Sequence, residues 1–234
     1  MKIRIKFSKM GSVKFIGHLD TMRYFQKAVR RANLPAAFSG GYSPHMIMSF
    51  ACPLGVGTES SGEYFDLELK EDVPASEVKD RLNDVMAEGF CVENVSLASE
   101  GKAGNAMAAV AAADYRIAFR EGKAPSEGWQ DKLPAFLSQS EIVITKTTKT
   151  GEKQVDIRPY IYEMKEVDDG IFCRLASASS NYTKPEAVMN AFFSFLGEEM
   201  KPYACMYTRL ELYTDLGEEM ELEKRFLPLY CMAG

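Results

Sequence analysis

The sequence predicts an α+β protein built from two tandem ferredoxin-like halves, each with the order β-α-β-β-α-β and an antiparallel sheet. Three observations lead to this prediction. Short segments of alternating apolar and polar residues recur along the chain, amphipathic helical segments separate them, and the pattern of the first half starts again after residue 113. We expect residues 1–98 to form the N-terminal half, 99–113 a linker with a short helix, and 114–234 an elaborated C-terminal half.

The N-terminal half opens with an alternating strand over residues 2–7. Ile3, Ile5 and Phe7 share one face of this strand, and three cations share the other. Leu34-Pro35 ends the helix that follows. The elements expected after the first strand are an extended piece at 13–16, a helix at 18–33, strands at 46–50 and 63–70, a helix at 74–88 and a strand at 90–97.

The C-terminal half repeats this pattern with an insertion. The insertion is a β-hairpin that turns at Thr150-Gly151. The elements expected are a strand at 115–120, a helix at 126–138, hairpin strands at 141–147 and 153–158, strands at 160–166 and 171–176, a helix at 184–196 and a strand at 207–214.

Composition indicates an ordinary globular protein. Of the 234 residues, 46% are hydrophobic and 26% are charged. Apolar stretches such as 106–113 are far shorter than the roughly 18 to 20 residues that cross a bilayer, and no secretory leader precedes the first strand. We therefore expect a cytoplasmic protein without a membrane span.

The five cysteines are odd in number and widely spaced. They are Cys52, Cys91, Cys173, Cys205 and Cys231. No pair has the two-residue gap of a zinc or iron–sulfur site. We expect reduced thiols in the core, no metal and no cofactor.

Charge is distributed unevenly along the chain. Residues 1–49 hold nine Lys or Arg and the single acid Asp20, a net charge of +8, against −13 for the remainder. Both histidines, His18 and His45, also lie in this basic segment. The asymmetry favours a polyanion as the partner of the N-terminal end.

The first predicted helix carries a cationic face. At 100° per residue its four cations fall within an arc of about 100°, opposite the apolar residues. They are Arg23, Lys27, Arg30 and Arg31, and Lys14 precedes the helix. Cations near a helix C-terminus are also favoured by the helix dipole, so this face is either a simple solvated surface or a site for an anion.

Two interpretations apply to the cations of the first strand. Lys2, Arg4 and Lys6 project from the sheet face that RNA-recognition modules of similar topology use. Asp66 and Glu68 are expected on the neighbouring strand and on the same face, so cross-strand ion pairs would consume that charge.

The loop over residues 39–45 combines two glycines with polar side chains. Its backbone amides are candidates for an anion-binding nest beside Tyr42, Ser43 and His45, although an ordinary loop would have the same composition. His18 and His45 could meet at one strand end as a general acid and base, or with Asp20 and Glu59 as a weak metal site. A capping role for Asp20 is the structural alternative.

The predicted hairpin of the second half is also basic. It carries Lys146, Lys149, Lys153 and Arg158. A protruding cationic hairpin is suited to contact a phosphate backbone, and lysines also protect edge strands from aggregation.

Several short motifs together resemble the radical SAM-linked protein family, a bacterial domain of unknown function. The motifs are Phe15-Ile16-Gly17-His18-Leu19-Asp20, Arg30-Arg31-Ala32-Asn33-Leu34-Pro35, Tyr42-Ser43-Pro44-His45, Pro53-Leu54-Gly55-Val56-Gly57, Val155-Asp156-Ile157-Arg158 and Asn181 ahead of Lys184-Pro185-Glu186. The resemblance implies an accessory role beside a radical SAM protein and a connection to RNA. It supplies no catalytic residue.

Three functions follow as hypotheses. The first is an RNA-binding module that presents tRNA or rRNA to a radical SAM partner through the anion-binding candidates named above. The second is a protein–protein adaptor without RNA binding, in which the basic helix docks on an acidic surface. The third is an RNA-modifying or RNA-cleaving enzyme of tandem ferredoxin-like type, an analogy of fold alone.

Overall fold

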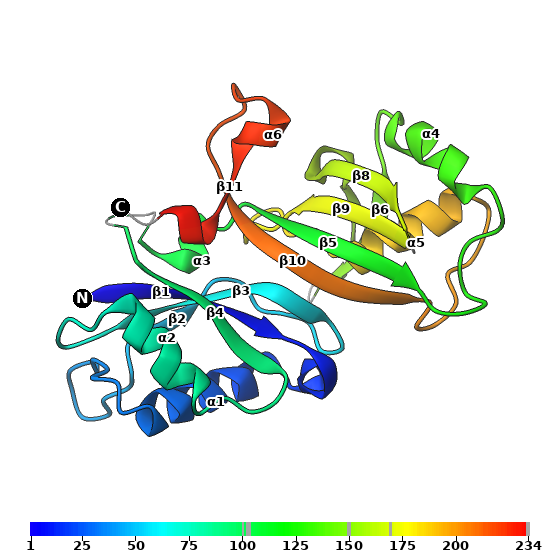
Figure 1. Cartoon of the computed structure of the whole chain (residues 1–234). Coiled ribbons are helices and arrows are strands. Elements are labelled where there is room, and N and C mark those ends of the chain that lie inside the picture. The colour runs from blue at the N-terminus through cyan, green and yellow to red at the C-terminus, as the bar shows by residue number, and fades with distance from the viewer. Residues whose placement is uncertain (100, 102–103, 149–150, 169, 233–234) are drawn as a thin grey trace. The chain divides into compact units, whose positions relative to one another are not determined.

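The computed structural model describes residues 1–99, 101, 104–148, 151–168 and 170–232 (Figure 1). The chain forms two compact units, one of Met1–Ala111 with Arg209–Gly234 and one of Ala112–Thr208. Both units combine helices with sheets whose strands pair mainly antiparallel, so the predicted α+β class is confirmed. Residues 209–234, which we expected in the C-terminal half, pack with residues 1–111.

The first unit contains most of the elements predicted for the N-terminal half. They are β1 (Lys2–Lys9), a 3-10 helix (Gly11–Phe15), α1 (His18–Arg31), β2 (Met48–Phe50), β3 (Glu59–Glu68), α2 (Ala75–Asn83), β4 (Phe90–Leu97), α3 (Ala106–Ala109), α6 (Leu222–Arg225), β11 (Phe226–Pro228) and a 3-10 helix (Leu229–Met232). Strand β10 (Cys205–Asp215) begins in the second unit and ends in the first.

Strand β1 lies at the centre of the sheet of this unit. It pairs antiparallel with β3 and β4, so Ile5 lies opposite both Phe65 and Val95. Strand β3 also pairs with β2, and it is the neighbour of β10. A Cβ atom at Gly62 would lie 2.5 Å from the carbonyl oxygen of Leu210, so β3 and β10 approach each other more closely there than any other residue allows.

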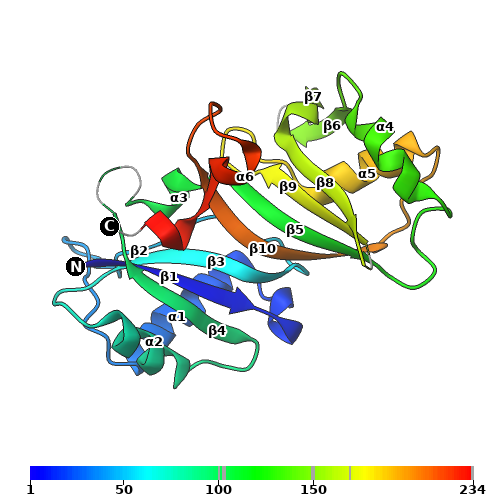
Figure 2. The same ribbon diagram turned by 45° about the horizontal axis from the view of Figure 1, so that its top comes forward.

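The core of the first unit lies between the sheet and α1 with α2, which cover the same face (Figures 1 and 2). Alternation along β1 buries Ile3, Ile5 and Phe7 as predicted. The Phe25 ring of α1 lies 4.5 Å from Phe7, centroid to centroid, and 4.9 Å from Phe65. Aromatic packing therefore fixes α1 on the sheet.

The second unit joins a sheet to a separate hairpin. Its elements are β5 (Ala112–Phe119), a 3-10 helix (Trp129–Lys132), α4 (Leu133–Leu137), β6 (Val143–Thr148), β7 (Gly151–Asp156), a 3-10 helix (Arg158–Tyr160), β8 (Ile161–Val167), β9 (Gly170–Ala176) and α5 (Pro185–Phe195). The sheet order is β10-β5-β9-β8, and β6 pairs with β7 in the predicted hairpin. Trp129, Phe136 and Phe192 are buried in its core.

Two expectations about individual elements were wrong, and some elements were not expected. Residues 13–15 belong to a 3-10 helix and not to an extended piece. The helix expected at 126–138 is a 3-10 turn followed by the short α4, because Pro134 lacks an amide hydrogen and is accepted only in a first helical turn. Helix α6 and strand β11 were not predicted.

Among the described residues, no helix is both long and apolar enough to cross a bilayer.

Candidate functional site

Three cations of β1, Lys2, Arg4 and Lys6, are paired with carboxylates of the same unit. Arg4 Nε donates to Asp66 Oδ1 at 2.8 Å, and Lys2 Nζ lies 3.6 Å from Asp66 Oδ2. Lys6 Nζ donates to Glu211 Oε2 at 2.6 Å. Asp66 therefore neutralises Lys2 and Arg4, as one of the two interpretations predicted. Glu211 of β10 neutralises Lys6, and the sequence did not indicate this pair.

The sheet face that carries these cations is covered by two segments of the chain. Figures 1 and 2 show α3 and the C-terminal 3-10 helix on the side of the sheet opposite α1 and α2. The Ala106 amide donates to Asp66 Oδ2 at 2.7 Å, and Arg4 Nη1 donates to the Leu229 carbonyl at 3.4 Å. Lys6 Nζ lies 4.9 Å from the Tyr230 ring centroid. This face is closed to a stacked RNA base.

A second group of charges is buried near the end of β1. Arg209 holds Glu63 through two hydrogen bonds, Nε to Oε1 at 2.7 Å and Nη2 to Oε2 at 2.5 Å, and neither residue is more than 4% exposed. Arg209 also donates to the Cys52 carbonyl at 3.0 Å. Lys9, 2% exposed, donates to the Ile16 carbonyl at 2.6 Å. The buried charges thus fix the backbone of two loops.

This buried group was missed in the sequence. Glu63 has the same parity along β3 as the apolar residues Phe65 and Leu67, so it falls on the inward face. An acid at a buried position requires a cation, which is the signal that would have revealed it. Its partner Arg209 is separated from it by 146 residues, and no local pattern indicates that contact.

His18 lies beside this buried group at the first residue of α1. Its ring meets Phe50 edge-on at 5.6 Å between centroids. Burial lowers the pKa of His18 below its usual value; the Glu63 carboxylate opposes this decrease, and the Lys9 and Arg209 cations add to it. Burial likewise lowers the pKa of Lys9. His18 is therefore a neutral imidazole at neutral pH.

The two histidines do not form an acid–base pair. His45 lines a small pocket with Lys2, at the start of β1, whereas His18 lies near Lys9, at its end. Eight residues of extended strand span about 23 Å between these two ends. The suggested meeting of the two histidines is therefore wrong, because the strand holds them apart.

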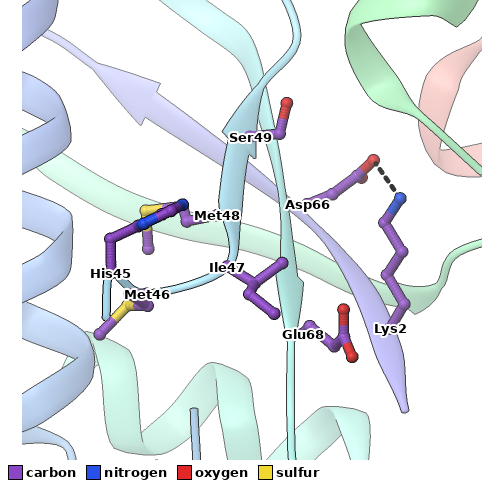
Figure 3. A pocket seen from close by; sticks show the side chains of 8 residues that line it. All are labelled: Lys2, His45, Met46, Ile47, Met48, Ser49, Asp66 and Glu68. Carbon is purple, nitrogen blue, oxygen red and sulfur yellow. Dashed lines mark ion pairs between the residues drawn. The ribbon is translucent and has the colours of Figure 1, made fainter. Parts of the chain in front are cut away.

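The loop over residues 39–45 closes on itself. Ser39 Oγ and His45 Nδ1 lie 2.8 Å apart, and the backbone amide of Ser39 donates to the His45 carbonyl at 2.9 Å. At its tip Tyr42 is fully exposed, and Ser43 is exposed as well. Figure 3 shows the pocket beside it, about 190 Å³ in volume, where Asp66 is already paired with Lys2.

Helix α1 carries the cations that face solvent. Arg23, Lys27, Arg30 and Arg31 are exposed, while Phe25 and Val29 on the opposite side are buried. Arg23 pairs with Asp20 at 3.0 Å, with both side chains about two-thirds exposed. Arg31 donates to the Val85 carbonyl at 3.1 Å. Within the described part of the chain, Lys27, Arg30 and Arg31 have no ion pair with a carboxylate.

Lys14 does not belong to this solvent-facing group. Its Nζ atom lies 3.0 Å from Glu59 Oε1, and Glu59 also accepts from the Gly11 amide at 3.1 Å. Asp20 was expected as a helix cap, but the cap residue of α1 is Gly17, without a side-chain hydrogen bond. Asp20 contributes an ion pair on the helix surface instead.

The hairpin of the second unit offers less cationic surface than predicted. Arg158 Nε donates to the Leu137 carbonyl at 2.6 Å and Nη1 to the Ile161 carbonyl at 3.2 Å, so its guanidinium has a structural role. Lys146 donates to the Tyr182 carbonyl at 3.1 Å and lies opposite the exposed Lys153. Lys149 lies outside the described residues.

The cysteines are all free thiols. Cys173 and Cys205 are buried as expected, and burial raises the pKa of Cys205 to about 11. Cys91 and Cys231 are exposed, which corrects the prediction of core positions for them. Among residues that the structure describes, no three His, Cys, Asp or Glu side chains gather as metal ligands.

Comparison with known proteins gives a family and distant structural likenesses. A chain in a structure titled "Crystal Structure of a Cbf5-Nop10-Gar1 Complex" is similar at 12% sequence identity and a TM-score of 0.46, over 90% of this chain and 48% of that chain. The chain thus spans about half the length of that protein. No curated protein matches the sequence. The model of a family described as "Uncharacterized protein conserved in bacteria (DUF2344)" matches residues 2–185, and the chain belongs to that family.

Proposed function

We propose that this chain is an accessory module that binds RNA on the exposed face of α1 and presents it to a radical SAM enzyme. One observation carries the proposal. Lys27, Arg30 and Arg31 are exposed and unmatched by carboxylates of the described chain, in a unit that pairs three cations of β1 with its own acids. An exposed stripe of like charges is self-repulsive, and a polyanion is the ligand that relieves this repulsion.

The enzyme partner and the RNA class rest on the resemblance of the sequence motifs to the radical SAM-linked family. This resemblance supports tRNA or rRNA as the bound RNA. It also supports a role in delivery of RNA rather than in chemistry.

We also infer that each unit is one ferredoxin-like half. The strand orders β4-β1-β3-β2 and β10-β5-β9-β8 support this layout, with α1 and α2 inserted in the first half and α4 and α5 in the second. In this interpretation the hairpin β6–β7 is an insertion after α4.

Salt-dependent RNA binding tests the proposed function. A variant with Lys27→Gln, Arg30→Gln and Arg31→Gln should bind RNA more weakly, and the slope of log affinity against log salt should fall by about 0.7 for each phosphate contact removed. The matched control carries Lys132→Gln, Lys184→Gln and Lys201→Gln, three exposed lysines of the second unit. An affinity that does not change over about a tenfold range of salt, or equal losses in both variants, would contradict RNA binding by α1.

A protein–protein adaptor is the second candidate, and the exposed apolar residues beside α1 favour it. Phe15 and Leu19 are 66% and 64% exposed, as interface anchors often are before binding. A pull-down with the radical SAM enzyme should be lost on charge reversal by Lys27→Glu, Arg30→Glu and Arg31→Glu if the helix docks on an acidic surface. Capture that survives the reversal would exclude this docking mode.

A further inference from the structure

The exposed face of α1 begins with an apolar group formed by Phe15, Leu19 and Val56. These side chains are 66%, 64% and 65% exposed. A single exposed apolar residue is ordinary, but three on adjoining segments indicate a binding surface. The segments adjoin because the Gly57 amide donates to the Lys14 carbonyl at 2.9 Å, which holds the Val56 loop against the residues before α1.

Helical geometry places Leu19, the member of this apolar group that lies on α1, in line with the cations. At 100° per residue, Leu19, Arg23 and Arg30 lie within an arc of about 40° on α1, with Lys27 about 40° further round. The 14 residues of the helix extend about 20 Å. One face therefore offers an aromatic and aliphatic end followed by a row of cations.

Internal contacts hold the apolar end in position before any ligand arrives. Lys9 binds the Ile16 carbonyl, one residue after Phe15, and Lys14 binds Glu59 at 3.0 Å. The Lys14 ammonium lies 5.7 Å from the centroid of the Phe15 ring. A preorganised ring loses little conformational entropy on binding, and a neighbouring cation favours a nucleotide over a neutral apolar ligand.

We propose that Phe15 is a stacking platform for an unpaired base, and that the α1 face therefore binds single-stranded RNA in preference to duplex. The inference rests on the proposed function and specifies its substrate class. Phosphates follow Arg23, Lys27 and Arg30, while Leu19 and Val56 border the base on Phe15. Stacking on exposed aromatics beside a cationic track is how proteins bind single strands without reading their sequence.

Fluorescence anisotropy with labelled oligonucleotides tests the inference on the full chain. The probes are an unstructured RNA, a DNA of the same sequence and a blunt-ended RNA duplex. Phe15→Ala should weaken binding of the single strands by about tenfold and leave the weaker duplex affinity unchanged, whereas Phe15→Tyr should stay near wild type. In Phe15→Trp, the fluorescence of the new indole should be quenched on binding, above a constant signal from the buried Trp129.

The control is Phe195→Ala, an exposed phenylalanine of the second unit, which should bind like wild type. Unchanged single-strand affinity in Phe15→Ala, together with loss in the Lys27, Arg30 and Arg31 variant, would overturn the base platform and leave the proposed function standing. If wild type binds none of the probes at low salt, both fail. Loss of radical SAM enzyme capture in Phe15→Ala would then identify the apolar group as a protein-docking surface.

Discussion

The cations of β1 and those of α1 come from the same basic stretch of 49 residues, yet they have opposite surroundings. On β1, Arg4 and Lys9 are each 2% exposed, and Arg4 is matched by the carboxylate of Asp66. On α1, Lys27 and Arg30 face solvent. The difference lies in position, because a central strand is covered on both faces and a helix on the sheet keeps one open side. Net charge of a segment therefore does not measure the charge available to a partner.

Removal of Arg209 should cause the largest effect, because it tests whether the buried charges sustain the fold. Arg209→Met leaves Glu63 buried without its bidentate partner, and we expect the free energy of unfolding to fall by about 3–5 kcal/mol in urea titrations. Addition of Glu63→Gln should recover part of this loss, because no unpaired charge then remains. A loss below about 1 kcal/mol would contradict the comparison, since surface ion pairs contribute that little.

Loss of one hydroxyl from the covered sheet face should have a smaller effect. Tyr64, 1% exposed, donates to Glu211 Oε1 at 2.5 Å, and burial raises the pKa of its phenol. Tyr64→Phe leaves Glu211 with Lys6 and the Leu212 amide, so we expect a loss of about 1–3 kcal/mol. Thermal unfolding measures this loss, and Tyr42→Phe at the exposed loop tip is the control that should change nothing.

A weaker, pH-dependent effect should appear at His18, on the border between the two regions. The pKa of His18 in the folded chain lies below the usual 6.5. At pH values between the folded and the unfolded pKa, the unfolded chain therefore binds more protons than the folded chain. Stability from the neutral imidazole is therefore complete above about pH 6.5 and declines as the pH falls below it. His18→Gln should flatten this part of the stability profile between pH 8 and pH 5. Parallel profiles for both proteins would show that His18 is not buried enough to matter.

Much of the fold could be predicted because its strongest signals are local. The alternation of apolar and polar residues predicted β1, and the bounds of β4 agree with the prediction. The error at 126–138 arose from Pro134, which delays the helix, and α6 with β11 carry no clear periodicity. The pairing of β10 with β3 depends on the close approach at Gly62, and a single sequence contains no signal for that contact.

The candidate site was less predictable, because most of the contacts that decide its charges are not local in the sequence. Helical periodicity identified the cationic face of α1 correctly, because exposure there depends on neighbours three and four residues away. Arg4 and Lys6 are not available to a partner because they bind Asp66 and Glu211. Arg158 is not available because it binds backbone carbonyls. Long-range hydrogen bonds decide whether a cation is structural, and sequence spacing does not contain them.

Substitution of the exposed cations of α1 should have the smallest effect on stability. The cations of β1 differ in this respect, because their side chains bind other parts of the fold. Lys27→Gln, Arg30→Gln and Arg31→Gln together should change the free energy of unfolding by no more than about 0.5 kcal/mol for each site, with a gain where self-repulsion is relieved. Among these three side chains, only Arg31 has a hydrogen bond to another described residue, the Val85 carbonyl. Chemical denaturation measured at low and high salt separates the two contributions, because only the repulsion is screened. A large loss that persists at high salt would place these side chains among the structural cations and remove the reason to assign them to a partner.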